Sequence, residues 1–149
     1  MFAYDDEYLY VAAVVKRTSP AADVQQDVGD REYDADLTGH DRIGLAFDVD
    51  RDYSTWYELE VDHRGQTADR CWEDRSWNPK WYVARDAHAD RWQMELAIPW
   101  AELTPAAPHV REVWGVSVVR TLPYAGYHGW TDPAVWPPSW ESFGLLRFQ

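Results

Sequence analysis

The feature that most constrains the fold is a series of short apolar or alternating runs, each ended by residues typical of turns. They recur along the whole chain, at Tyr8–Val15, Arg42–Val49, Thr55–Asp62, Lys80–Arg85, Arg91–Ile98, Val113–Thr121 and Phe143–Phe148. Alternation with a period of two places successive side chains on opposite faces of a β-strand. Because no long helical pattern interrupts these runs, they predict an all-β protein.

Two neighbouring runs predict a β-hairpin. In Arg42–Val49 and in Thr55–Asp62, apolar side chains occupy alternate positions, so each strand has one apolar and one polar face. The connection over residues 48–54 is short and polar, as a turn between antiparallel strands is. Arg91–Ile98 repeats the pattern. Antiparallel strands at such spacings predict a two-sheet β-sandwich, formed as one domain by residues 1–149.

The remaining segments are less regular. Pro99–Leu103 has proline where the first turn of a helix tolerates it, and predicts a single helical turn. Arg17–Asp41 and Pro123–Ser142 carry neither a strand nor a helix pattern and predict loops. The first strand pattern begins almost at the start of the chain, at Tyr8, so we expect that a leading segment is missing.

The charge balance excludes some partners. The 14 basic and 26 acidic side chains give a formal net charge of −12. A nucleic-acid partner is therefore not expected, because binding phosphates requires clustered Lys and Arg. No apolar run approaches the roughly 18 residues of a membrane span, and the start of the chain lacks the pattern of a signal peptide. We expect no membrane partner.

Tryptophan is the compositional outlier. Ten Trp and nine Tyr among 149 residues exceed what one core can bury, so some rings must face solvent or a ligand. Trp92, Trp100 and Trp114 lie in strand or turn positions and are predicted to be buried. The tryptophans of the loop clusters Cys71–Trp81 and Trp130–Trp140 cap the ends of the sandwich, fill the core or bind a ligand. Flat aromatic rings beside carboxylates and Arg suit sugars, which have apolar C–H faces and hydroxyl groups.

Several fragments, in their order and spacing, resemble the family 9 carbohydrate-binding modules and their DOMON-like relatives. They are Asp5–Ala12, Tyr57–Asp62, Glu95–Trp100, Trp114–Gly115 followed by Arg120, and Phe143–Leu146. The resemblance spans nearly the whole chain. It implies a β-sandwich that binds sugars, often at chain ends, by holding a ring between two tryptophans, and that commonly carries structural calcium. The usual first strand of that family is absent from the pattern here.

The resemblance also implies which residues contact the sugar. The loop after the second hairpin strand supplies one ring, from Trp72 or Trp77, with Glu73 beside it. The loop before the final strand supplies the other ring, from Trp136 or Trp140.

Arg120 resembles the strand-end arginine of the same pattern. Its alternation with apolar neighbours turns it toward the apolar side, where a charge must be paired. Either it forms a salt bridge with a carboxylate such as Glu95 or Glu141, or its guanidinium binds sugar hydroxyls as a fork.

Alternate aspartates in residues 48–52 resemble the start of a calcium loop, but no glycine follows at the sixth position, so the segment is not an EF-hand. Two readings remain open. A structural calcium ion is held by Asp48 and Asp50, or by Asp5 and Asp6; alternatively, residues 48–52 form an ordinary solvated turn.

Other chemistries have less support. The single cysteine, Cys71, excludes an internal disulfide and multi-cysteine metal sites, and is expected to be a small buried residue. The five histidines lack paired ligand spacing, so zinc is not expected. Carboxylate pairs such as Glu58 and Glu60 are not accompanied by a nucleophile motif, so we expect no enzyme. Some DOMON-like relatives hold haem through Met and His, but Met94 fits core packing better than ligation with His128.

Together these observations predict a monomeric, non-catalytic carbohydrate-binding module of a larger extracellular or periplasmic protein. The alternative is a structural or protein-interaction sandwich, in which the aromatic loops pack against a neighbouring domain.

Overall fold

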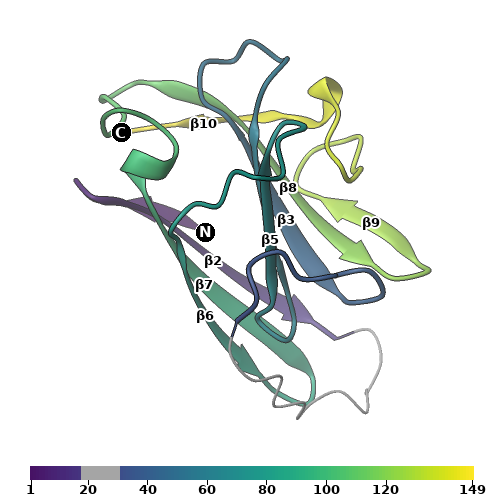
Figure 1. Ribbon diagram of the computed structural model, residues 1–149. Helices are drawn as coiled ribbons and strands as arrows, with labels where there is room; N and C mark the ends of the chain where they lie inside the picture. The colour runs from purple at the N-terminus through teal and green to yellow at the C-terminus, as the bar shows by residue number, and fades with distance from the viewer. Residues whose placement is uncertain (18–30) are drawn as a thin grey trace.

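The chain folds into two antiparallel β-sheets that face each other (Figure 1). This computed structural model describes residues 1–17 and 31–149. One sheet has the order β1-β2-β7-β6, formed by Phe2–Tyr4, Tyr8–Lys16, Arg91–Pro99 and Tyr82–Ala87. The other has the order β10-β8-β3-β4-β5, with β9 beside β8, formed by Gly144–Arg147, Val113–Leu122, Arg42–Asp48, Tyr57–Asp62, Thr67–Cys71 and Gly126–Gly129. The predicted all-β, two-sheet architecture is confirmed.

The core fills the space between the sheets because each strand turns its apolar alternate residues inward. In the predicted hairpin of β3 and β4, Leu45 lies opposite Leu59, and both are buried. The buried cluster also contains the three tryptophans expected in the core, which are Trp92, Trp100 and Trp114. Among the described residues, two short 3-10 turns lie between strands: η1 (Trp100–Glu102) follows β7 and η2 (Trp140–Ser142) precedes β10. η1 confirms the predicted helical turn.

Three strands were not predicted. β1 precedes β2 and pairs with it, so Tyr8 does not begin the first strand. β5 is short and polar on both faces. β9 lies within the predicted loop Pro123–Ser142, where backbone hydrogen bonds to β8, and not a side-chain pattern, define it. Of the other predicted loop, Arg17–Asp41, residues 18–30 lie outside the described residues. Within the described ranges, no helix is long and apolar enough to span a bilayer.

Candidate functional site

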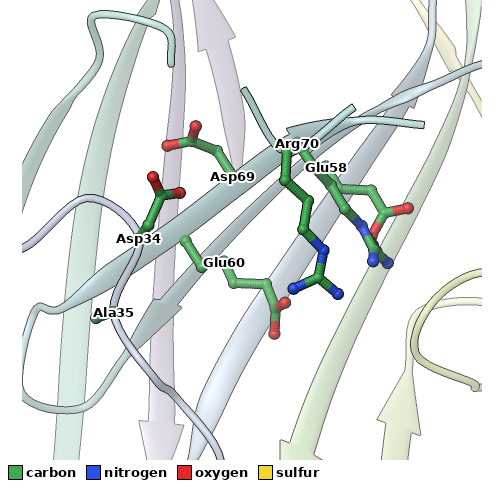
Figure 2. A pocket seen from close by; sticks show the side chains of 8 residues that line it. Asp34, Ala35, Glu58, Glu60, Asp69 and Arg70 are labelled. Carbon is green, nitrogen blue, oxygen red and sulfur yellow. Dashed lines mark hydrogen bonds and ion pairs between the residues drawn. The ribbon is translucent and has the colours of Figure 1, made fainter. Parts of the chain in front are cut away.

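The outer face of the six-stranded sheet, which points away from the core, is hollowed along β4 and β5. Alternation along β4 turns Glu58 and Glu60 to this face, and Arg70 of β5 lies opposite Glu58. A hollow of about 320 Å³ lies between these side chains. Figure 2 shows Asp34 and Asp69 beside each other on one side of the hollow, with Glu58, Glu60 and Arg70 on the other.

Glu58 is the buried centre of this face, with only 4% of its surface exposed. Its Oε2 accepts hydrogen bonds from Arg70 Nε at 2.8 Å and Nη2 at 2.6 Å, and its Oε1 accepts one from Trp56 Nε1 at 2.8 Å. Burial raises the pKa of Glu58, and the hydrogen bonds from Arg70 and Trp56 oppose that rise. The two-pronged contact fixes the orientation of the guanidinium, so these polar groups are preorganised.

Trp72 places an indole beside this network. It lies in the turn after β5, where its φ of 55° is in the left-handed region and its backbone N–H donates to Trp56 O at 2.8 Å. The Trp56 and Trp72 rings meet edge to face, with centroids 4.6 Å apart, and Trp72 remains 40% exposed. A second hollow, of about 280 Å³, is lined by Trp72 and Glu73 together with the Glu58 carboxylate and the Arg70 guanidinium.

Arg75 supplies an unpaired charge. Its exposed side chain lines both hollows and a third one of about 380 Å³. In the part of the chain that the structure describes, no carboxylate forms an ion pair with it. Its five N–H donors are therefore available to a ligand.

Asp69 lies where the hollowed face meets the sheet edge. It is 6% exposed, and its Oδ2 accepts a hydrogen bond from Trp81 Nε1 at 3.1 Å, whereas its Oδ1 has no partner among the described residues. Burial raises the pKa of Asp69 to about 6 against the opposing effect of the Trp81 hydrogen bond. The backbone N–H of Ala35 donates to Thr67 O at 2.9 Å and holds the neighbouring Asp34 at this edge.

Of the residues predicted to contact sugar, Trp72 and Glu73 line the second hollow, whereas Trp77, Trp140 and Arg120 line none of the hollows described above. Trp77 lies on the core side of β4, where its ring is 4.9 Å from that of Tyr57 and packs against the core. Trp140, in η2, is 62% exposed but lines none of the hollows described above.

Trp136 differs most from the sequence-based expectation, because its ring is covered. It is 7% exposed and packs in a small cluster with Ala46, Trp56 and Val119. A Cβ atom at Gly44 would lie 2.6 Å from the Trp136 ring, so the indole rests directly on the backbone of β3. The glycine in the middle of a strand was the available signal, since it marks a close approach.

Arg120 lies on the core side of β8 and not on the hollowed face. Its Nε and Nη2 are 2.8 and 2.6 Å from the carboxylate oxygens of Asp41, and Nη2 also donates to Lys16 O at 2.9 Å. A carboxylate partner was predicted, but the suggested partners, Glu95 and Glu141, are wrong. Asp41 takes that place because it directly precedes β3, which pairs with β8.

Sequence reasoning did not identify Trp56, Arg70 and Arg75 as site residues. Arg70 lies on β5, which was missed because its five residues show no apolar alternation. The available signal was the pair of opposite charges, Glu58 and Arg70, which become cross-strand neighbours once β4 and β5 are paired.

The predicted calcium ligands, Asp48 and Asp50, belong to a cluster of carboxylates that are close enough together to bind one ion. Oxygens of Asp48, Asp50 and Asp52 lie within 4.8 Å of one another. Asp48 is fully buried; its Oδ2 accepts a hydrogen bond from the Tyr53 backbone at 3.0 Å, but its Oδ1 has no partner within the described ranges. Burial raises the pKa of Asp48, and the neighbouring Asp50 adds to that rise. A buried carboxylate with one unpartnered oxygen and two more carboxylates beside it fits Ca²⁺, which binds oxygen ligands.

The alternative calcium ligands, Asp5 and Asp6, are less suited to bind an ion. The Asp5 carboxylate accepts hydrogen bonds from the backbone of Glu7 and Tyr8 and from the hydroxyl of Tyr10, each at 2.8 Å. These bonds explain why the pKa of Asp5 is lowered, and they assign its side chain to a turn.

Two further expectations concern the sulfur-containing residues Met94 and Cys71. Met94 is 1% exposed within the core, so its predicted core packing is confirmed, whereas His128 is exposed on β9. Cys71 is only partly buried, and burial raises the pKa of its thiol.

Comparison with known proteins identifies the fold. No protein-family model matches the chain, and no curated protein matches it significantly. Among solved structures, a family 9 carbohydrate-binding module from Caldicellulosiruptor kristjanssonii in complex with glucose is similar, with a TM-score of 0.66 and 14% identity over 99% of this chain and 74% of that chain. The complex of such a module with cellotriose has a TM-score of 0.67 and 12% identity, covering 99% and 72%.

A third similar structure is that of a protein from Bacteroides uniformis proposed to bind carbohydrate, with a TM-score of 0.67 and 11% identity over 99% of this chain and 76% of that chain. Identities this low establish the architecture alone. The chain therefore has the β-sandwich fold of the family 9 carbohydrate-binding modules.

Proposed function

We propose that the protein binds carbohydrate on the outer face of its six-stranded sheet, with Trp72 as the platform for a sugar ring. The observation that carries the proposal is the hollow of about 280 Å³ in which an exposed indole adjoins a fixed carboxylate–guanidinium pair and Arg75. Similar solved structures hold glucose and cellotriose, which supports this class of ligand. We also propose that the chain is a module of an extracellular or periplasmic carbohydrate-active protein.

Each group has a distinct role in this proposal. The indole of Trp72 stacks on the apolar face of a pyranose. The guanidinium of Arg75 and the carboxylate of Glu73 hydrogen-bond to ring hydroxyls, since both side chains line the hollow and are exposed. Glu58 and Arg70 form the rigid polar floor beneath the ring.

The two glutamates of this face, Glu58 and Glu60, are arranged for binding and not for hydrolysis. Glu58 is held by Arg70 and Trp56, and Glu60 Oε2 is 2.6 Å from Arg42 Nε. A general acid must deliver a proton to the leaving oxygen, but both oxygens of Glu58 already accept hydrogen bonds from Arg70 and Trp56. We therefore propose a non-catalytic role.

Replacing Trp72 by alanine is expected to weaken sugar binding by roughly 1–3 kcal/mol, or about 5- to 150-fold, because the stacking surface is removed. Calorimetric titration with a panel of neutral mono- and oligosaccharides measures this loss. Trp130→Ala is the matched control, because Trp130 is also exposed, at 54%, but lines none of the hollows described above. Trp140→Ala, measured in parallel, tests the second ring that the resemblance implied.

The proposal is wrong if the wild-type protein binds no sugar of the panel. Concentration-dependent self-association or capture of a neighbouring domain, without sugar affinity, would then support the protein-interaction alternative.

We also propose a structural calcium ion at Asp48 and Asp50, with Asp52 nearby. The ion would neutralise clustered carboxylates at the turn between β3 and β4. Calcium at about 100 times its Kd is expected to raise Tm by roughly 5–10 °C, and Asp48→Asn is expected to abolish the rise. Thermal unfolding with calcium and with a chelator measures both. Asp6→Asn, an exposed carboxylate outside this cluster, is the control; an unchanged wild-type Tm contradicts the site.

A further inference from the structure

We infer that the protein binds a chain of several neutral sugar units along a row of adjoining hollows that runs from Trp72 to Tyr127. This inference rests on the proposed function and concerns the length and charge of the ligand. The outer face then serves as an extended binding surface with an aromatic group at each end, instead of a site for a single sugar ring.

The hollows on this face adjoin one another, because neighbouring hollows share lining side chains. Arg75 lines the hollow beside Trp72, the central hollow of about 320 Å³ and the next one of about 380 Å³. Arg42 lines that third hollow and a fourth of about 250 Å³, which also contains Tyr124 and Tyr127. We call this row of four hollows the outer groove.

The groove is longer than a single pyranose. Trp72 is anchored to Trp56, just before the start of β4, and Arg42 lies opposite Asp62 at the other end of that strand. A strand of six residues spans about 20 Å. Several linked sugar rings therefore fit between the two ends.

Tyr127 provides a second stacking surface at the far end. In the sheet register Arg42 lies opposite Thr121, and Thr121 lies opposite Tyr127, so the three side chains share the outer face. Tyr127 is 44% exposed. The Arg42 guanidinium is held by Glu60, with Nε 2.6 Å from Oε2, so the distal end also has an ordered polar group.

The charge of the groove selects against acidic glycans. Its carboxylates outnumber its guanidinium groups: the acidic residues are Asp34, Asp36, Glu58, Glu60, Asp69 and Glu73, and the basic ones are Arg42, Arg70 and Arg75. The whole chain also carries a net charge of −12. A polyuronate or sulfated chain meets like charge along this path, whereas a neutral glycan does not.

The test uses gluco-, xylo- and manno-oligosaccharides of one to six units, titrated by calorimetry. Affinity for the series that binds is expected to rise with length beyond the disaccharide. Tyr127→Ala is expected to weaken hexasaccharide binding at least about fivefold and to leave mono- and disaccharide binding unchanged, whereas Trp72→Ala weakens both. Tyr82→Ala is the control, because Tyr82 is 60% exposed but lies on the other sheet.

The outcomes separate this inference from the proposed function. Affinity that does not increase beyond two units, or an unchanged hexasaccharide affinity in folded Tyr127→Ala, overturns the extended groove while sugar binding stands. If the wild-type protein binds no sugar of the three series, both the extended groove and the proposed function are wrong. A gluco- or manno-hexasaccharide oxidised at C6 to uronic acids is expected to bind at least about fivefold more weakly than the unoxidised chain at low salt, with the gap narrowing as salt is added. Equal or tighter binding of the oxidised chain overturns the selection for neutral sugars.

Discussion

Replacing Asp41 by alanine is expected to lower the free energy of unfolding by about 3–5 kcal/mol. Asp41 accepts two hydrogen bonds from Arg120 and one, at 3.0 Å, from the indole of Trp92. Trp92 is 1% exposed and the side chain of Arg120 is 17% exposed, so the variant leaves a largely buried charge and a buried N–H without their partner. Arg120 also reaches Lys16 O, and the loss therefore loosens the contact between the two sheets.

Urea unfolding, followed by far-ultraviolet circular dichroism, measures this loss. Asp6→Ala removes an exposed aspartate and is expected to change the stability by less than about 0.5 kcal/mol. Sugar affinity of the folded Asp41→Ala protein is expected to be unchanged, because Asp41 lies outside the outer groove. A loss below about 1 kcal/mol would show that this ion pair is not a main link between the sheets.

Replacing Gly44 by valine is expected to destabilise the protein by about 3 kcal/mol or more. The first added carbon alone would lie 2.6–2.7 Å from three atoms of the Trp136 ring. Neither the backbone of the central strand β3 nor a ring that is 7% exposed can move away without loss of packing. The indole is therefore expected to leave its site, and a red shift of tryptophan fluorescence would report its exposure.

A double-mutant cycle identifies the cause. Trp136→Ala alone is expected to cost about 3 kcal/mol or more, because it leaves a cavity over β3. In the double variant with Gly44→Val, valine fills part of that cavity, so the combined loss is expected to be clearly smaller than the sum of the single losses. Additive losses would contradict direct contact between Gly44 and Trp136.

Much of the architecture was predictable because strand alternation is a local property. The runs that became β3, β4 and β7 each have one face of large apolar side chains, and burial of that face determines which side meets the core. β1, β5 and β9 were not predictable in this way. They are short, and hydrogen bonds to a longer neighbour hold them in place.

The candidate site was predictable only in part. The excess of aromatic residues correctly indicated exposed rings, since Trp72, Trp130 and Trp140 are exposed. It did not distinguish them from Trp136, whose ring is covered by contacts with residues far away in the sequence. Arg120 shows the same limit: alternation predicted a paired charge, but not that Asp41 would be the partner.

The sequence by itself therefore determined the all-β class, the antiparallel hairpin and the inward-facing tryptophans, because a period of two and the cost of exposing apolar surface act along each strand separately. Only the tertiary structure decided which indoles stay exposed and which charges meet. Those outcomes depend on strand order and cross-strand register. These place Glu58 against Arg70, Gly44 beneath Trp136 and Asp41 beside Arg120. The two residues of each pair are too far apart in the sequence for a local pattern to relate them.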